Sequence, residues 1–185
     1  VERKRPAPGI DYRPHDFKHP SEVPALSDFG GEHVTRYTTS THDKLGFLTA
    51  DPDLIQEMID HYAAKIEAAA DDLALYRYDP QDGADTLVIS YGVTSRAASV
   101  AVREARKAGR RVSSLVLQTL FPVPEKALRR AMAGVRRVVA PEMNLGQYRQ
   151  EIERLAPPGV TVAGVNRMDT TLISPMEIAL QGELQ

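Results

Sequence analysis

The sequence contains no cysteine and no tryptophan, and it has no apolar run of the roughly 18 residues that a membrane-spanning helix requires. Without thiols the chain can form no disulfide, no thiolate zinc site and no iron–sulfur cluster of its own. The first ten residues are basic and rich in proline, unlike the apolar stretch of a secretory signal peptide. We therefore expect a cytoplasmic protein with no contact to a membrane.

The 185 residues that are present include 42% hydrophobic side chains. This share supports a real core, and the length suits one domain of ordinary size with an extension. The chain begins with Val1 rather than methionine. We therefore expect it to be a piece of a longer protein.

Charge is spread unevenly along the chain although the net charge is only −2. Residues 103–137 carry 10 basic and 2 acidic side chains, a balance that suits contacts with nucleic acid, phosphate or an acidic protein. The first basic residues of this segment recur at helical spacing opposite alanine and valine: Arg103, Arg106, Lys107 and Arg110. This spacing is typical of a solvent-exposed helix face. The face has no aromatic residues for base stacking, so we expect no nucleic-acid partner.

The first half of the chain predicts little regular structure. Residues 1–50 are rich in proline and have scattered apolar residues, which predicts an extended connector laid over a neighbouring surface. Residues 51–84 are interpreted as a helix and a linker. Asp51 is the predicted N-cap, and the apolar residues that follow at spacings of three and four predict one buried stripe.

From residue 85 the pattern alternates between strand and helix. Apolar runs at 86–92, 111–117, 136–142 and 159–165 predict strands, and the segments 94–109, 124–134, 146–155 and 174–181 predict helices. Short links between them predict a small, mainly parallel α/β sheet with helices on both faces, formed by residues 85–185. Thr94 or Ser95 is the predicted cap of the first helix, and Ser174 that of the last.

Ligands of open parallel sheets bind beyond the carboxyl ends of the strands, so we searched those segments for chemistry. Gly92, Thr94 and Ser95 begin a helix whose N–H groups could bind an anion, although a capping role for the two hydroxyls is the simpler reading. Glu142 is a lone carboxylate that can accept backbone N–H bonds, and Gly146 suits a turn with positive φ.

Two further candidates lie in the connector. His42 and Asp43 form either a polar turn that ends at Gly46 or a catalytic dyad, and we favour the turn. Taken alone, the residues offer no complete catalytic constellation.

At this point the sequence resembles a known family. The segments "TLFPVPEKALRRAM" and "VRRVVAPEMNLGQYRQEI" resemble the C-terminal, transketolase-like domain of the alpha subunit of 2-oxoacid:ferredoxin oxidoreductases, with the 2-oxoglutarate type favoured. The family pattern E-M-N-x-G-Q is matched in order by Glu142, Met143, Asn144, Gly146 and Gln147. "SYGVTSRAASVAV" resembles the first strand and helix of the same domain.

The connector carries a second likeness. The segment "TTSTHDKLG" is similar to the family pattern T-G-x-x-H-D-x-x-G, with Thr38, His42, Asp43 and Gly46 in place. Thr39 replaces the usual glycine. The likeness as a whole covers roughly residues 30–181.

The resemblance implies an enzyme that converts a 2-oxoacid and CoA to acyl-CoA, CO2 and reduced ferredoxin. In this family, thiamine diphosphate, Mg and the substrate are held by other domains of the alpha subunit and by a beta subunit, and the iron–sulfur cluster must lie on a partner. The chain lacks the Y-P-x-T-P and G-D-G segments that the family uses for those roles. The resemblance thus implies a structural, interface-forming domain without catalytic, cofactor-binding or metal-binding residues, inactive by itself.

Two alternatives stay open. The chain could be a stand-alone α/β module that binds a phosphate-bearing ligand at its strand ends. It could also be a scaffold that binds an acidic protein through residues 103–137.

Overall fold

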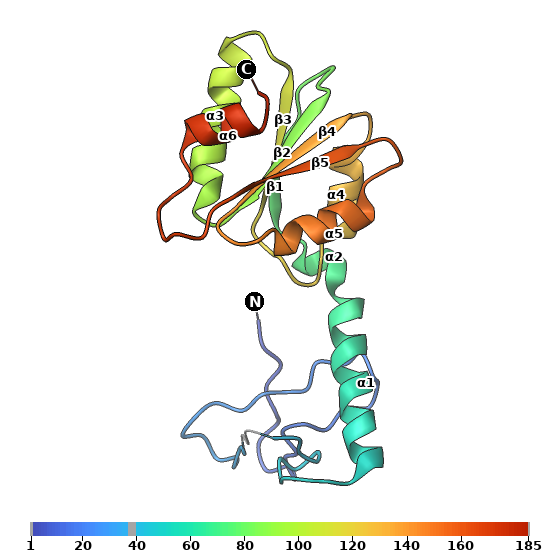
Figure 1. The fold of residues 1–185 in the computed structure, drawn as a ribbon. Coiled ribbons are helices and arrows are strands. Elements are labelled where there is room, and N and C mark those ends of the chain that lie inside the picture. Colours follow the sequence, from blue (N-terminus) through green and yellow to red (C-terminus); the bar gives the residue numbers. More distant parts are fainter. Residues whose placement is uncertain (1, 37–39, 185) are drawn as a thin grey trace. The chain divides into compact units, whose positions relative to one another are not determined.

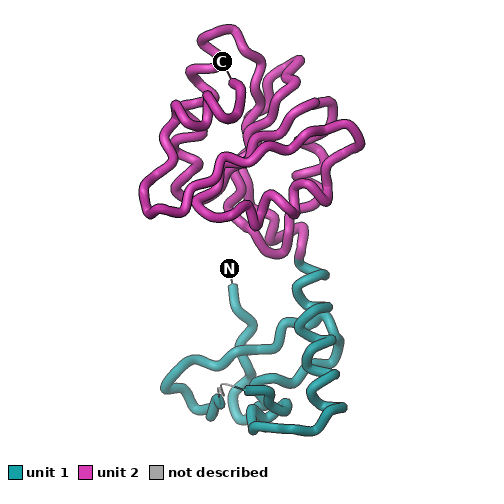
Figure 2. Tube along the Cα trace, in the orientation of Figure 1, with its two compact units in different colours: residues 1–69 teal, residues 70–185 magenta. Residues whose placement is uncertain are grey.

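The computed structural model describes residues 2–36 and 40–184, so Thr38 and Thr39 of the connector motif lie outside the described residues. The chain divides into two compact units, Val1–Ala69 and Ala70–Gln185, coloured separately in Figure 2. The predicted boundaries at residues 50 and 84 remain interpretations of the sequence, but the contacts within the chain group the 51–68 helix with the connector.

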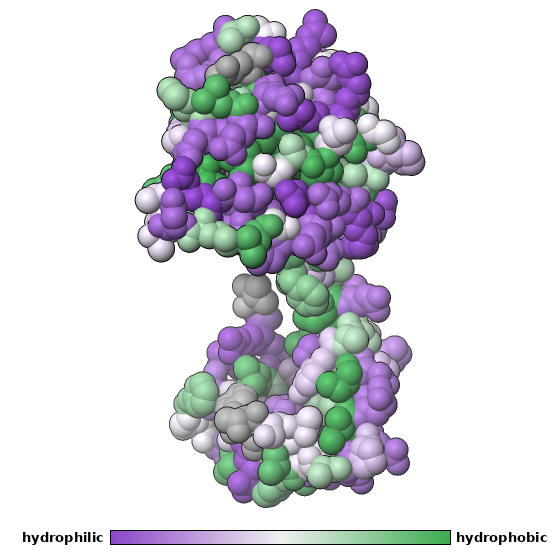
Figure 3. Space-filling view, viewed as in Figure 1, coloured by the Kyte–Doolittle hydropathy of each residue, from purple (hydrophilic) through white to green (hydrophobic). Residues whose placement is uncertain are grey.

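The first unit combines an irregular coil with one long helix, α1 (Pro52–Ala68). Asp51 caps this helix as predicted, because its carboxylate accepts the N–H groups of Asp53 and Leu54 at 2.9 and 3.3 Å. The unit has little apolar core. Apart from Gly46, its buried residues within 2–36 and 40–69 are Pro14, Met58 and His61. Apolar residues such as Phe29 and Ile59 are exposed instead, and Figure 3 shows green residues at the surface of this unit.

The second unit is built on a five-stranded sheet with the strand order β1-β3-β2-β4-β5 (Figure 1). Strands β2 to β5 run parallel, whereas β1 pairs antiparallel with β3 at one edge. The strands are β1 (Tyr76–Asp79), β2 (Thr86–Tyr91), β3 (Val112–Leu117), β4 (Arg137–Glu142) and β5 (Thr161–Asn166). The helices are α2 (Ala70–Leu73), α3 (Thr94–Lys107), α4 (Glu125–Met132), α5 (Gln147–Leu155) and α6 (Pro175–Gln181).

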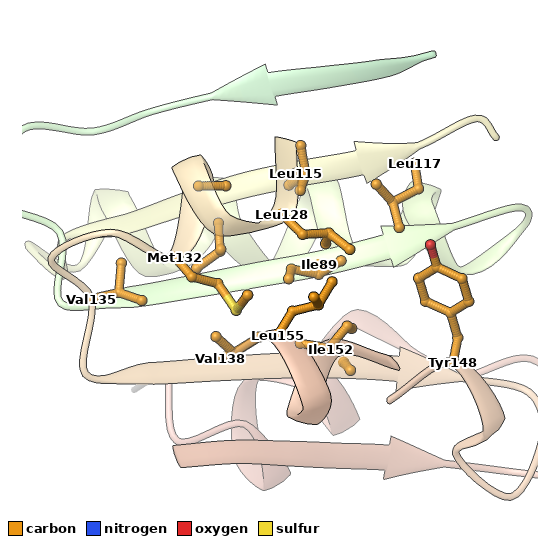
Figure 4. Packing of buried hydrophobic residues seen from close by; sticks show 13 residues of the cluster. Ile89, Leu115, Leu117, Leu128, Met132, Val135, Val138, Tyr148, Ile152 and Leu155 are labelled. Atoms are coloured by element: carbon orange, nitrogen blue, oxygen red, sulfur yellow. The ribbon is translucent and has the colours of Figure 1, made fainter. Parts of the chain in front are cut away.

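A separate apolar cluster covers each face of the sheet. Helices α4 and α5 pack on one face through residues such as Leu128 and Ile152, which lie against Ile89 and Leu115 of the sheet (Figure 4). Helices α3 and α6 pack on the other face through residues such as Val102 and Ile178, next to Val88, Val139 and Val165. The predicted α/β fold, with a mainly parallel sheet and helices on both faces, is confirmed.

The stretch predicted to be a linker contains an element that the sequence analysis missed. Strand β1 has only four residues and alternates between half-buried and exposed positions, so its apolar signal is short. Arg106 of α3 holds it in place: Nη1 donates to the Asp79 carboxylate at 2.8 Å and Nε donates to the Val112 carbonyl at 2.9 Å. The edge strand is therefore held by its pairing with β3 and by a tertiary ion pair, neither of which its own pattern reveals.

None of the described helices is both long enough and apolar enough to cross a membrane.

Candidate functional site

The strand order places a topological switch point between β2 and β4. From β2 the chain crosses to β3 on one side, and from β4 it crosses to β5 on the other side. The ladder between β2 and β4 runs only from Thr86 opposite Arg137 to Val88 opposite Val139. Towards the carboxyl ends the two strands therefore separate, which is the position where open α/β sheets form a ligand crevice.

Side chains bridge this position. The carboxylate of Glu142, at the end of β4, is 1% exposed and accepts three hydrogen bonds. The Tyr91 hydroxyl at the end of β2 donates to Oε2 at 2.9 Å, and the backbone N–H groups of Tyr148 and Arg149 donate at 3.1 and 2.8 Å. The two N–H donors belong to the first turn of α5, where the helix dipole also favours a negative charge. The Glu142 carboxylate thus joins helix α5 to the ends of strands β2 and β4.

The turn between β4 and α5 extends the same network. Asn144 donates through Nδ2 to the Tyr91 hydroxyl at 2.9 Å, and its Oδ1 accepts the N–H groups of Gly146 and Gln147 at 2.7 and 3.3 Å. Gly146 precedes α5 with φ +92°, the positive value that the sequence predicted. The side chain of Gln147 is exposed and makes no hydrogen bond that the described residues show. Hydrogen bonds to the side chains of Asn144 and Glu142 therefore fix the turn between β4 and α5.

Burial changes the proton affinity of the two phenols in this cluster, which we call the Tyr91–Glu142 network. Burial raises the pKa of Tyr91 to about 12, and the hydrogen bond to Glu142 acts in the same direction. Burial also raises the pKa of Tyr148 well above its usual value. The Tyr148 hydroxyl is buried and has no hydrogen-bond partner within the described part of the chain. It lies at the carboxyl end of the apolar cluster in Figure 4.

Sequence analysis missed both tyrosines. Tyr91 and Glu142 are 51 positions apart, and only the pairing of β2 with β4 brings them together. The one sequence signal for Tyr91 is its position at the end of a predicted buried strand. Nothing comparable marks Tyr148, which reads as an ordinary apolar position of α5.

The predicted capping role of Thr94 and Ser95 is wrong. The residue before α3 is Val93, and no side chain caps this helix. Both hydroxyls donate backwards instead, Thr94 to the Tyr91 carbonyl and Ser95 to the Gly92 carbonyl, each at 2.7 Å. The carbonyls lie at the end of strand β2 and just after it, and a helical hydroxyl three residues later reaches each of them. The two hydroxyls therefore link strand β2 to helix α3, and their protons are not available to an anion.

His42 and Asp43 lie in the first unit, in the turn that the sequence predicted. Asp43 accepts the N–H groups of Leu45 and Phe47, both at 2.9 Å, through Oδ1. Gly46 has φ +85° in this turn. His42 Nδ1 bonds to the carbonyl of Asp43, at 3.1 Å, rather than to its carboxylate. The pair is therefore not arranged as a histidine–carboxylate dyad.

The basic segment 103–137 is largely neutralised by acids from other parts of the second unit. Asp71, Asp79, Asp85 and Glu183 each accept an ion pair from it. Glu104 and Glu125 pair with further basic side chains of the segment. Because its charges are paired locally, the segment does not form a continuous basic surface.

The described residues do not fit the cofactors that the sequence resemblance implies. Within residues 2–36 and 40–184 there is no cluster of three or more His, Asp or Glu side chains suited to a metal ion. The sequence has no cysteine for an iron–sulfur cluster. A cavity of about 350 Å³ lies beside the start of α3, but its lining is mainly apolar, with residues such as Val93, Met143 and Leu172. That lining does not suit a diphosphate.

The mainly parallel sheet with its bridged switch point defines an α/β domain, and comparison with known proteins identifies its family. Residues 84–178, about half of the chain, match the pyruvate:ferredoxin oxidoreductase core domain II. The chain belongs to this family.

Curated relatives are similar over most of the chain. The 2-oxoglutarate synthase subunit KorA of Methanocaldococcus jannaschii is 29% identical over 178 residues, which cover 96% of this chain and 47% of that protein. KorA of Methanothermobacter marburgensis is 32% identical, with 85% of this chain and 41% of that protein covered. The ketoisovalerate oxidoreductase subunit VorB of Methanothermobacter thermautotrophicus is 38% identical over 52% of this chain and 27% of that protein.

The chain spans about half the length of the KorA relatives it matches. A solved structure supports the fold: the 2-oxoglutarate:ferredoxin oxidoreductase from Magnetococcus marinus, solved with 2-oxoglutarate, coenzyme A and succinyl-CoA bound. It aligns with a TM-score of 0.79 at 18% identity, over 100% of this chain and 33% of that chain.

Proposed function

We propose that this chain is a non-catalytic structural and interface domain within the alpha subunit of a 2-oxoacid:ferredoxin oxidoreductase. The observation that carries the proposal is the engagement of Glu142. The carboxylate stands at the switch point where a reacting group would be expected, yet two backbone N–H groups and one phenol already bind it. A buried acid held in this way stabilises a fold and is poorly placed to exchange protons with a substrate.

The reaction of the whole enzyme follows from the relatives and remains part of the proposal. A 2-oxoacid and CoA are converted to acyl-CoA and CO2, and ferredoxin receives the electrons. We place thiamine diphosphate and Mg in other alpha-subunit domains and a beta subunit, since this chain lacks the G-D-G segment. We place the iron–sulfur cluster on a partner, since this chain contributes no thiolate ligand. Several relatives are named as subunits, which supports a multi-subunit assembly, and we propose a cytoplasmic location for it.

The proposed substrate is 2-oxoglutarate. The named 2-oxoglutarate synthase subunits are similar over 80% or more of this chain, whereas the ketoisovalerate subunits are similar over 52% and 69%. This sequence lacks the family's Y-P-x-T-P substrate segment, so the relatives carry the substrate proposal.

The interface role rests on exposed apolar side chains near the carboxyl edge of the sheet. Val93 and Leu145 follow β2 and β4 and are 50% and 67% exposed, and Leu172 before α6 is 62% exposed. Apolar residues gathered at one edge are typical of a contact with another domain or subunit. Gly92 and Gln147 lie at the same edge, and we include them in this surface. His42 and Asp43 are proposed as contact residues of the connector.

The test is to express the full-length subunit that contains this chain together with its neighbouring subunit and to measure CoA-dependent reduction of ferredoxin. We expect 2-oxoglutarate to be the best substrate, with pyruvate and 2-oxoisovalerate as comparison substrates. Efficient turnover of 2-oxoisovalerate with none of 2-oxoglutarate would reassign the substrate. Full activity of this chain without any partner would disprove the structural role.

A further inference from the structure

All five histidines of the sequence lie in the first unit, and Ala70–Gln185 contain none. Two of the ring contacts in this unit are especially close. The rings of His15 and His42 have centroids 3.8 Å apart and are tilted by 34°, and His61 stacks on Phe17 at 3.9 Å. Because the buried side chains described in this unit are few, these ring contacts are part of the packing that it does have.

The hydrogen bonds of His42 connect the coil to α1. Nδ1 faces the carbonyl of Asp43 at 3.1 Å, and Nε2 faces the hydroxyl of Tyr62 at 3.2 Å. A carbonyl only accepts, so Nδ1 carries the proton, and in the neutral ring Nε2 accepts the hydroxyl proton of Tyr62. Tyr62 belongs to α1, so this bond joins the coil to the helix.

His15 connects three segments of the coil. Its Nε2 donates to the Arg36 carbonyl at 3.3 Å, and its backbone N–H donates to the Lys44 carbonyl at 3.1 Å. Together with the ring contact to His42, these bonds join residues 15, 36 and 42–44. The contact therefore holds together parts of the unit that are distant in sequence.

The surroundings of the two rings disfavour a positive charge on His15. Burial lowers the pKa of His15, and His42 and Lys65 act in the same direction, while the Arg36 carbonyl and Asp43 oppose them. Lys44 is nearby but is paired with Glu57 at 2.7 Å and with Asp16 at 3.9 Å. The folded unit therefore favours a neutral His15.

We propose that the contacting rings of His15 and His42 form an acid-sensitive latch that joins distant segments of the coil. Protonation of both rings places two positive charges in contact, and these charges repel each other. The stabilisation is present above the ordinary histidine pKa of about 6.5 and is lost as the pH falls below it.

The latch goes beyond the proposed function and does not depend on the reaction that the enzyme performs. Hydrogen–deuterium exchange of the 185-residue chain tests it, with protection expressed relative to the intrinsic exchange rate at each pH. Between about pH 8 and about pH 5 we expect the segments around His15 and His42 to lose protection by about tenfold or more. The sheet of the second unit contains no histidine and serves as the internal reference.

Two variants make the test specific. The double variant His15→Gln/His42→Gln keeps polar side chains but cannot gain charge, so its protection should not depend on pH in this range. His19→Gln is the matched control, because His19 is exposed and contacts only Ser21 in the described structure. It should keep the pH dependence of the wild-type chain.

A pH-independent wild type, or a double variant with the wild-type pH dependence, would overturn the latch. If the double variant loses all protection in the first unit, the ring titration of the wild-type chain by NMR decides. His15 must then titrate below the ordinary histidine pKa of about 6.5, because burial lowers its pKa. Titration of His15 at or above that value would also overturn the proposal.

Discussion

The hydroxyl of Tyr91 donates a 2.9 Å hydrogen bond to the carboxylate of Glu142 across the point where strands β2 and β4 separate. The two side chains therefore occupy the switch point, the position where open α/β sheets commonly bind ligands. It also couples the protonation of a phenol to the stability of the fold. The consequences can be measured at both residues.

Tyr91 should ionise later than an ordinary tyrosine. Its pKa is raised to about 12 by burial and by Glu142, so the folded state favours the neutral phenol. This stabilisation of the folded state is fully present below pH ~10, the ordinary pKa of a tyrosine. It is lost as the pH rises through the raised pKa of the folded state. Ultraviolet difference titration of the wild type and Tyr91→Phe should differ mainly near pH 12, as that pKa requires. A difference complete by pH of about 10 would contradict the buried hydrogen bond.

Two serines that both read as helix caps should respond differently to removal of the hydroxyl. Ser174 caps α6 in a capping box with Glu177, accepting its N–H at 3.2 Å and donating its own N–H at 2.8 Å. Ser174→Ala should cost about 1 kcal/mol of unfolding free energy. Ser95→Ala removes only a bond to the Gly92 carbonyl and should cost about half as much or less. Urea denaturation followed by circular dichroism measures both, and equal losses would contradict the structural difference.

Gly146 should be hard to replace because it precedes α5 at φ +92°. A Cβ at this position would also lie 3.2 Å from Cζ of Arg149. Gly146→Ala should destabilise the second unit by about 1 kcal/mol or more. Gly146→Asn is the matched variant, since asparagine tolerates positive φ better, and its loss should be smaller. The same urea denaturation decides, and an alanine variant as stable as wild type would show that the turn can relax.

The sequence predicted those features of the fold that depend on local periodicity. The continuous apolar run of β2 and the capping pattern of Ser174 both mark their elements locally, and both were recovered. Strand β1 was missed because four alternating residues carry little signal and a distant arginine, Arg106, completes its anchoring. Thr94 was assigned wrongly because a hydroxyl at a helix start can donate to a preceding carbonyl as readily as it accepts an N–H.

The candidate site was harder to predict than the fold. The sequence identified Glu142 and its turn, but it could not name the partners of the carboxylate. Those partners depend on which strands lie next to each other, and strand order is not encoded in any local pattern. Tyr91 therefore entered only with the structure.

The chain alone should not bind thiamine diphosphate or decarboxylate a 2-oxoacid. Its described residues show no donor cluster for the magnesium ion that would bridge the diphosphate, and the cavity beside α3 is mainly apolar. Titration calorimetry with thiamine diphosphate and magnesium should give no heat of binding. Binding at micromolar concentration would show that this chain holds part of the cofactor site.

Glu142→Gln should destabilise the second unit although it changes the shape of the side chain little. The glutamine amide is uncharged and accepts through one oxygen only, so all three donors around Glu142 lose a charged partner and at least one loses its acceptor. Because hydrogen bonds to a buried charge are strong, the loss should be about 2 kcal/mol. Glu151→Gln on the same helix is the control: its partner Arg154 is half exposed, and the loss should stay within about 0.5 kcal/mol.

The same variant separates a structural from a catalytic role for Glu142 in the assembled enzyme. If the carboxylate only fastens α5 to the sheet, Glu142→Gln should weaken assembly, measured by sedimentation, before it alters the chemical step. Complexes that do assemble should then decarboxylate the 2-oxoacid in a single turnover at close to the wild-type rate, because the pocket of the reacting atoms is unchanged. A fully assembled complex whose single turnover is abolished would place Glu142 in the active site, since an intact assembly leaves no structural reason for the loss.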